Sequence, residues 1–312
     1  MKDLDVMRHL IRPESDTLEA VREDINMGRP GEMKEAVRIL DEWVHQQPHF
    51  IEKNIPLPYL EMTIVNTKGS VERAKHILEN MFLARTQRPA DFEPRDVKEY
   101  YKVIKGHFYE VFTTNLTPQR QRIYINRCHG KPDEHVVENG YKFAYNVVDY
   151  LKMHDYHSGV MSVFDLTDLD LQYVLTHINL VALKTSLITF LDCYGLRMKR
   201  IHVVTKSKII HQVIAIIKPF FSRKIVDRLV FHQAPEELLQ YYPEECLPKD
   251  YGGTDKSIEE LQEWILGLLS SPQHRAHMEV MSRAAIDAAL CPATHTANID
   301  HVAGTFRTLN ID

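Results

Sequence analysis

The feature that most restricts the fold of this chain is an alternation that begins near residue 100. Short runs rich in β-branched and aromatic residues are separated by helical stretches near 134 to 154 and 170 to 193. The runs are Arg122 to Asn126, Val160 to Leu166 and Ile201 to Thr205, with a fourth at Leu229 to His232. Because each helical stretch can return the chain parallel to its start, the pattern predicts an α/β fold, a mostly parallel sheet flanked by helices.

The first hundred residues have a different periodicity. Apolar residues recur there at helical spacing, at Met33, Val37, Leu40 and Val44 and again at Val71, Ala74, Ile77, Leu78, Met81 and Phe82. Glycine and proline residues separate these helical stripes. The sequence therefore predicts a small all-helical N-terminal domain over residues 1–100, an α/β domain over 101–256 and a C-terminal helical extension with a tail over 257–312.

Composition indicates an ordinary folded chain, with 44% hydrophobic and 26% charged residues. Its four cysteines, Cys128, Cys193, Cys246 and Cys291, form no Cys-x-x-Cys pair, which argues against a zinc site and a disulfide framework. No apolar run reaches the roughly 18 residues of a membrane-spanning helix, and the first residues do not resemble a signal peptide. The expected location is cytoplasmic.

Motifs of enzymatic chemistry are missing from the sequence. It contains no Gly-x-Gly-x-x-Gly, no Walker loop, no Gly-x-Ser-x-Gly and no His-Glu-x-x-His. No spacing in the chain selects a Ser/His/Asp triad, because the fold brings such residues together. We therefore expect a protein that is not an enzyme, with no catalytic residues and no cofactor.

Two groups of residues could bind a metal. Asp165, Asp168 and Asp170 follow a predicted strand, but a strand-to-helix turn with an N-cap explains them more simply. Histidine pairs stand at i, i+4 (His45 and His49) and i, i+3 (His154 and His157), with no further ligands nearby in the sequence. We expect no metal site.

Residues 208 to 221 form an unusually apolar helical segment. Its apolar residues are Ile209, Ile210, Val213, Ile214, Ile216, Ile217, Phe220 and Phe221. Pro219 is expected to end or kink the helix. An ordinary core helix would also have an apolar face, although this face is wider than a surface helix needs.

Basic residues flank this segment. Residues 196 to 232 contain nine Lys or Arg against one acid, Asp227, in a chain of net charge -5. An apolar helix with flanking cations is typical of peripheral association with an anionic membrane surface. Nucleic acid is the rival polyanion, but the acidic balance and the lack of interleaved aromatic residues make it the weaker interpretation.

The chain from about 121 to 253 resembles CRAL-TRIO domains, most closely the branch of tocopherol and retinaldehyde carriers. The resemblance rests on four local matches: Val-Phe-Asp-Leu at 163 to 166, Leu-Arg-Met-Lys-Arg-Ile-His at 196 to 202, Ile-Lys-Pro-Phe-Phe at 217 to 221, and Leu-Pro-Lys-Asp-Tyr-Gly-Gly at 247 to 253. The segment at 71 to 80 also looks like the family's N-terminal helical domain.

This resemblance implies a CRAL-TRIO lipid-binding domain over residues 101–256, with a mobile gate helix. The implied function is binding of a hydrophobic ligand (tocopherol, a retinoid, a carotenoid or another isoprenoid) and its transfer between membranes. The implied gate helix contains Ile209, Ile210, Val213, Ile214, Ile217, Phe220 and Phe221. The implied ligand pocket contains Phe164, Ser186, Thr189, Phe190, Tyr194, Ile201, Ile210, Val213, Ile214 and Ile217. The implied phosphoinositide patch contains Arg197, Lys199, Lys224 and Arg228.

The chain departs from the family pattern at three places. Near Thr67 and Lys68 it lacks the usual Arg-rich stretch, so a weaker phosphoinositide site is expected. Thr205 and Ser207 replace the usual Asn and Pro before the gate, and Gly195 stands where Pro is usual. The alternative function is a phosphoinositide-reading membrane adaptor that carries no cargo. The sequence does not identify the ligand or the oligomeric state.

Overall fold

The computed structural model describes residues 16–290, and its centre is a five-stranded sheet. The strands stand in the order of the sequence: β1 (Phe108–Phe112), β2 (Arg122–Gly130), β3 (Val160–Leu169), β4 (Met198–Val204) and β5 (Leu229–His232). Strands β2 to β5 are parallel to their neighbours. The predicted α/β class and all four predicted strands are confirmed. The strand β1, which was not predicted, pairs antiparallel with β2 at one edge.

All connections between the parallel strands run through helices. The first crossover is α7 (Glu134–His154), the second contains α8 (Leu171–His177) and α9 (Leu180–Ile188), and the third contains α10 (Ile210–Ile217) and α11 (Arg223–Val226). Because crossovers are right-handed and the strand order is consecutive, these helices belong on one face of the sheet. Side chains of β4 that pack on α10 include Ile201 and Val203. We call this the helix-covered face.

The segment from 235 to 258 packs on the opposite face. It contains three short 3-10 helices, Pro235–Gln240, Glu244–Cys246 and Lys249–Tyr251. Its buried residues, among them Leu238 and Leu247, share one apolar core with Ile123, Ile125 and Val163 of the sheet. We call this the closed face.

The predicted helical stretch near 170 to 193 is divided in the structure, which breaks it after His177. The side chain of Asp170 accepts a hydrogen bond from the Tyr173 amide (2.9 Å) and begins α8, whereas Asn179 accepts one from the Ala182 amide (3.0 Å) and begins α9. A wider π-helical turn, Thr189–Cys193, follows α9. The capping role of Asp170 confirms the structural interpretation of the acidic trio. No group of potential ligands within residues 16–290 is arranged to hold a metal.

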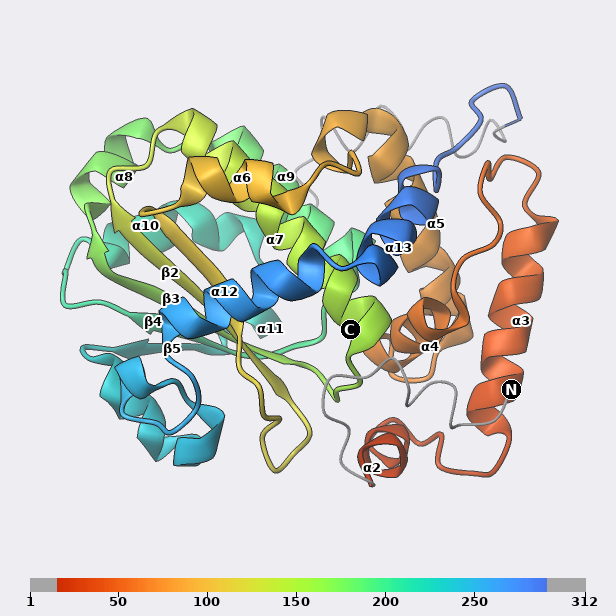
Figure 1. Cartoon of the computed structure of the whole chain (residues 1–312), viewed down its shortest axis with the longest axis horizontal. Coiled ribbons are helices and arrows are strands. Elements are labelled where there is room, and N and C mark those ends of the chain that lie inside the picture. The colour runs from red at the N-terminus through yellow and green to blue at the C-terminus, as the bar shows by residue number, and fades with distance from the viewer. Residues whose placement is uncertain (1–15, 291–312) are drawn as a thin grey trace.

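The N-terminal part is helical as predicted. It consists of α2 (Thr17–Glu23), α3 (Glu32–Gln46), α4 (Leu57–Asn66), α5 (Val71–Gln87), the 3-10 turn Pro89–Asp91 and α6 (Val97–Ile104). Figure 1 shows α3, α4 and α5 beside the sheet, with α12 (Ile258–Leu269) and α13 (Pro272–Ser282) extending from the sheet toward them. The domain boundaries near 100 and 256 stay predictions, and the predicted tail after Pro292 lies outside the described residues.

Residues near the end of the described chain complete the N-terminal core. Met281, Ala284 and Ile286 belong to the same buried cluster as the apolar residues of α2 to α5. The Ile51 amide donates to the Ala285 carbonyl (2.9 Å), and the Ile286 amide donates to Thr86 Oγ1 (2.7 Å). Within residues 16–290 no single helix is long and apolar enough to cross a membrane, although the bent pair Leu171–His177 with Leu180–Cys193 passes by length and composition alone.

Candidate functional site

The predicted gate segment, residues 208 to 221, lies on the helix-covered face. Helix α10 spans Ile210–Ile217, and a 3-10 turn, Lys218–Phe220, follows it. This turn contains Pro219, which has no amide hydrogen to continue the α-helix. Ile210 and Val213 are buried, whereas the other isoleucines of α10 and the two phenylalanines keep accessible surface. The gate segment is therefore apolar but only half-buried.

The predicted pocket residues fall into two apolar clusters. Phe164, Ile201, Ile210, Val213 and Ile214 lie in one cluster, which links β3 and β4 to α10 and also contains Ile209 and Phe221. Phe190 and Tyr194 lie in a second cluster, which links the end of α9 to α5 and α7. Ser186 and Thr189 are buried near the end of α9, and Ile217 is partly buried on α10.

The hydroxyl groups in the predicted pocket differ in their availability to a ligand. Tyr194 donates to Asp149 Oδ2 (2.6 Å). Thr189 donates to the Thr185 carbonyl (2.8 Å) and accepts from Arg88 (2.7 Å). The Ser186 hydroxyl is buried and has no hydrogen-bond partner among residues 16–290. Ser186 is thus the member of this set whose hydroxyl has the weakest contact with a neighbour, the Tyr145 hydroxyl.

Asp149, which accepts the hydrogen bond from Tyr194, belongs to a buried ionic group between α5 and α7. Asp149 also accepts from Arg85 (3.0 and 3.2 Å), and both side chains are fully buried. Removing one partner from such a pair leaves an uncompensated buried charge, so these residues hold the two helices together. The hydroxyl of Tyr194 therefore has a structural partner, and only its ring is open to another role.

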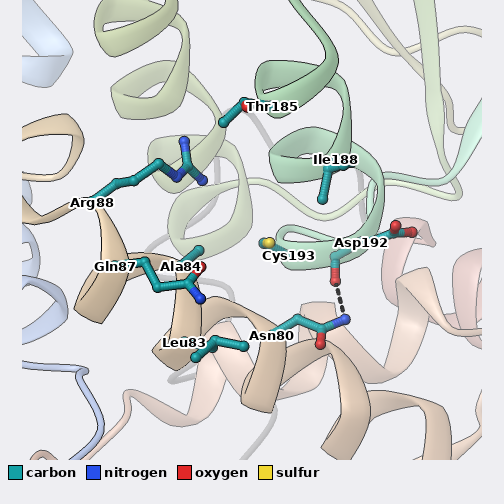
Figure 2. A pocket seen from close by; sticks show the side chains of 9 residues that line it. All are labelled: Asn80, Leu83, Ala84, Gln87, Arg88, Thr185, Ile188, Asp192 and Cys193. Atoms are coloured by element: carbon teal, nitrogen blue, oxygen red, sulfur yellow. Dashed lines mark hydrogen bonds between the residues drawn. The ribbon is translucent and has the colours of Figure 1, made fainter. Parts of the chain in front are cut away.

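A small cavity of about 110 Å³ lies between α5 and the end of α9. Figure 2 shows Asn80 donating to the Asp192 carbonyl (3.1 Å) beside it, and Arg88 and Gln87 at its rim. Ligand pockets for drug-sized molecules measure about 300 to 1,000 Å³, so this cavity is too small for an isoprenoid. It contains none of the predicted pocket residues. Cys193, on its wall, is a free thiol whose pKa burial raises to about 12, so it is unreactive.

The predicted basic patch is brought together by two elements, β4 and α11. Lys199 is on β4, Arg197 is just before it, Lys224 is on α11 and Arg228 is just after α11. Arg228 donates to the Met198 carbonyl, which fixes its side chain against β4. Within residues 16–290, Asp24 is the acid that forms ion pairs with this patch, at 2.7 Å from Arg197 and 3.4 Å from Lys199.

The N-terminal helices add cations to this patch. Lys68 follows α4 in a left-handed conformation (φ 56°). Burial and the neighbouring cations Lys224, Arg197, Arg73 and Arg228, in that order, hold the pKa of Lys68 below its usual value. The missing Arg-rich stretch is thus partly replaced by Lys68 and Arg73. The sequence placed Lys68 near the patch but gave no sign of Arg73, because α5 reaches the patch only through the fold.

The parallel sheet, its helical crossovers and the apolar gate segment define an α/β domain of the CRAL-TRIO type. Residues 109–253 match the model of the CRAL/TRIO domain, and this segment is therefore a CRAL/TRIO domain.

Two relatives in known proteomes match a shorter segment. The α-tocopherol transfer protein-like protein of Mus musculus is 35% identical over 83 residues, which are 26% of this chain and 24% of that protein. The protein of the same name from Homo sapiens is 37% identical over 81 residues, 26% of this chain and 23% of that protein. The match thus spans about a quarter of each relative. The crystal structure of Sfh5 aligns with a TM-score of 0.48 and 15% identity, over 80% of this chain and 92% of that one.

Proposed function

We propose that this protein binds one small hydrophobic molecule, such as a tocopherol, a retinoid, a carotenoid or another isoprenoid, and transfers it between membranes. In this proposal the gate segment covers the ligand and opens at anionic or phosphoinositide-containing membranes. The observation that carries the proposal is a CRAL/TRIO domain whose sheet is covered by an apolar but half-buried helix, α10. No catalytic step is proposed.

Burial on the helix-covered face supports an apolar ligand. Phe164 lies on β3, which has a strand on each side, yet its side chain is only partly buried. The buried Ser186 hydroxyl has only a weak contact with the Tyr145 hydroxyl, so a polar group of a ligand would give it a better partner. Most of the affinity would come from buried apolar area, at about 25 cal/mol per Å².

The basic patch supports delivery to anionic membranes. Each cation near an anionic leaflet contributes about 1 kcal/mol, so the four predicted patch residues favour contact by roughly a thousandfold. Salt weakens this attraction, since the cations are near the surface. When an apolar helix opens there, its apolar face contacts the membrane interface instead of the ligand.

Mass spectrometry of an organic extract, with an absorption spectrum, tests the carrier proposal directly. The protein would be purified from its native source without detergent. One stoichiometric hydrophobic compound is expected. An extract without such a compound, with phosphoinositide binding intact, would support the alternative, a membrane adaptor without cargo.

The gate can be tested by the double substitution Ile210→Asp and Ile214→Asp. Both residues pack in the cluster beneath α10, so the variant is expected to lose ligand retention and vesicle binding. Ile39→Asp with Ile51→Asp is the matched control, because both isoleucines are exposed, at 39% and 59%, and lie on the N-terminal part. Unchanged transfer by the gate variant would contradict the assignment of the gate.

The patch can be tested by Lys224→Glu with Arg228→Glu. Binding to anionic vesicles is expected to fall at least thirtyfold, from about 1 kcal/mol for each lost cation, with ligand affinity unchanged. Lys34→Glu with Lys98→Glu, at exposed positions of α3 and α6, keeps the same net charge as the patch variant. An equal loss in both variants would show a general charge effect instead of a site.

A further inference from the structure

The register of the sheet defines which side chains share the helix-covered face with the predicted pocket. Glu110 on β1 pairs with Asn126 on β2, which pairs with Phe164 on β3, which pairs with Val203 on β4. The neighbouring row on the same face contains Tyr124, Ser162 and Ile201. Paired residues in adjacent strands point to the same side, and so do residues two apart. Glu110, Tyr124 and Asn126 therefore face the same side as Phe164 and Ile201.

Polarity changes along these two rows. At the β4 end the row members Ile201 and Val203 pack with Ile210 and Val213 of α10 in an entirely apolar cluster. At the β1 end the same face contains a carboxyl, a phenol and an amide. A molecule lying across the strands would have its apolar part beneath α10 and its other end at β1 and β2.

The polar end is a connected group. Glu110 is 4% exposed and accepts hydrogen bonds from the Tyr124 hydroxyl and from Asn126 Nδ2. Burial raises the pKa of Glu110 to about 8, against which only these two hydrogen bonds act. The carboxyl is therefore neutral near pH 7. No described cation lies close enough to contribute, so a second negative charge here would have no counterion.

Tyr124 and Asn126 are surrounded by protein and yet keep accessible surface. Both are on β2, between β1 and β3, and both are only partly buried. Burial, and then the neighbouring Glu110, raise the pKa of Tyr124 well above its usual value. Phe164 is also only partly buried. Partly accessible side chains on central strands are expected where a face of the sheet borders an internal cavity.

A neutral Glu110 leaves Tyr124 free to bind in either direction. If the acid donates its proton to the Tyr124 oxygen, the Tyr124 hydroxyl can donate to a carbonyl oxygen of a ligand. If Tyr124 donates to Glu110, its oxygen can accept from a ligand hydroxyl. A carboxylate or phosphate group of a ligand would lie beside Glu110 as a buried negative charge without a counterion. Both hydrogen-bonding arrangements therefore disfavour such a ligand.

We infer that Tyr124, supported by Glu110 and Asn126, binds the polar end of the cargo, and that this cargo is a neutral lipid with a hydroxyl or carbonyl group. The inference rests on the proposed carrier function, which it makes more specific. It excludes ionised fatty acids and phosphate-bearing lipids whose charged end would lie at β1 and β2. It also sets an orientation, with the apolar end of the cargo beneath the gate segment.

The test compares Tyr124→Phe with Tyr109→Phe in the full chain after its native lipid is removed. Tyr109 is on β1 next to Glu110, but pairs with Arg127 and so faces the other side of the sheet. The probes are retinol, the retinol analogue with hydrogen in place of the hydroxyl, and oleate. Retinol affinity is expected to fall about three- to tenfold in Tyr124→Phe, the effect of one hydrogen bond, and to stay unchanged in Tyr109→Phe.

Each further result has one meaning. The analogue should bind both variants as it binds the wild type, which also shows that Tyr124→Phe is folded, and oleate should bind the wild type at least tenfold more weakly than retinol. Equal losses for retinol and its analogue, no loss for retinol, or tight oleate binding would overturn the inference and leave the carrier function standing. A wild-type protein that binds none of the three probes and also yields no stoichiometric hydrophobic compound on organic extraction would overturn the proposed function itself.

Discussion

The two faces of the sheet differ in how completely their side chains are packed and hydrogen-bonded. On the closed face, His202 bonds to Tyr242 and to His232 at 2.7 Å each, and Tyr251 donates to Asp165 at 2.8 Å. On the helix-covered face, α10 leaves most of its isoleucines half-buried. The closed face is thus a fully packed core, whereas apolar side chains on the helix-covered face keep surface that no part of the described chain covers. The two faces are therefore expected to respond differently to substitution.

The largest expected effect concerns the neutral carboxyl of the helix-covered face. Unfolded chain loses the Glu110 proton near its ordinary pKa of 4.5, whereas folded protein keeps it until about 8. The folded state therefore binds more protons in this window, and stability falls as pH rises through it, by about 5 kcal/mol at 1.36 kcal/mol per unit. Glu110→Gln should lack this fall. Urea unfolding of both proteins from pH 4.5 to 8.5 measures the difference, and parallel curves would contradict a neutral Glu110.

The next effect compares the two faces directly. Leu247→Ala on the closed face, where Leu247 has no exposed surface, should cost about 2 to 5 kcal/mol of unfolding free energy. Ile217→Ala on α10 should cost under about 1 kcal/mol, since Ile217 is already partly exposed. Both costs follow from denaturant midpoints at constant slope. Equal costs would show that the two faces are packed alike, and would remove the contrast.

The smallest effect lies at the edge of the patch. Asp24 is 41% exposed and forms ion pairs with Arg197 and Lys199, so it competes with an anionic headgroup for these cations. Asp24→Asn should strengthen binding to phosphoinositide vesicles about threefold, because exposed ion pairs contribute under about 1 kcal/mol. Asp16→Asn, which removes an ion pair with Arg120 instead, is the matched control. Vesicle co-sedimentation distinguishes the two variants.

Local sequence predicted the parallel strands because each is a short β-branched run with helices on both sides. It did not predict β1, since Phe108–Phe112 is an edge strand of five residues whose partner lies beyond a loop. Sequence also could not identify Glu110 as a buried acid, because Tyr124 and Asn126 become its neighbours only through pairing of β1 with β2. A run of aromatic and β-branched residues around one glutamate was the available signal.

The residues of the site were predicted from sequence motifs, whereas their hydrogen bonds and charged neighbours depend on contacts between elements that are distant in the sequence. The gate segment and the four patch cations were predicted from local matches. The hydrogen bond from Tyr194 to Asp149 joins residues 45 apart in the sequence, and the approach of Lys68 to Lys224 and Arg228 joins the N-terminal helices to the segment that follows β4. No spacing in one chain gives such contacts, because they depend on how helices pack.

The contacts of residues 281 to 286 have a consequence for synthesis. Phe50 stacks on Phe82 with ring centroids 4.0 Å apart, and Phe50 also forms a β-bridge with Ile286. Domains usually fold in the order in which the ribosome releases them, but these early helices meet their last packing partners only when more than two hundred further residues have emerged. During that interval the two phenylalanines are incompletely covered, and chaperones or proteases have time to act on the nascent chain.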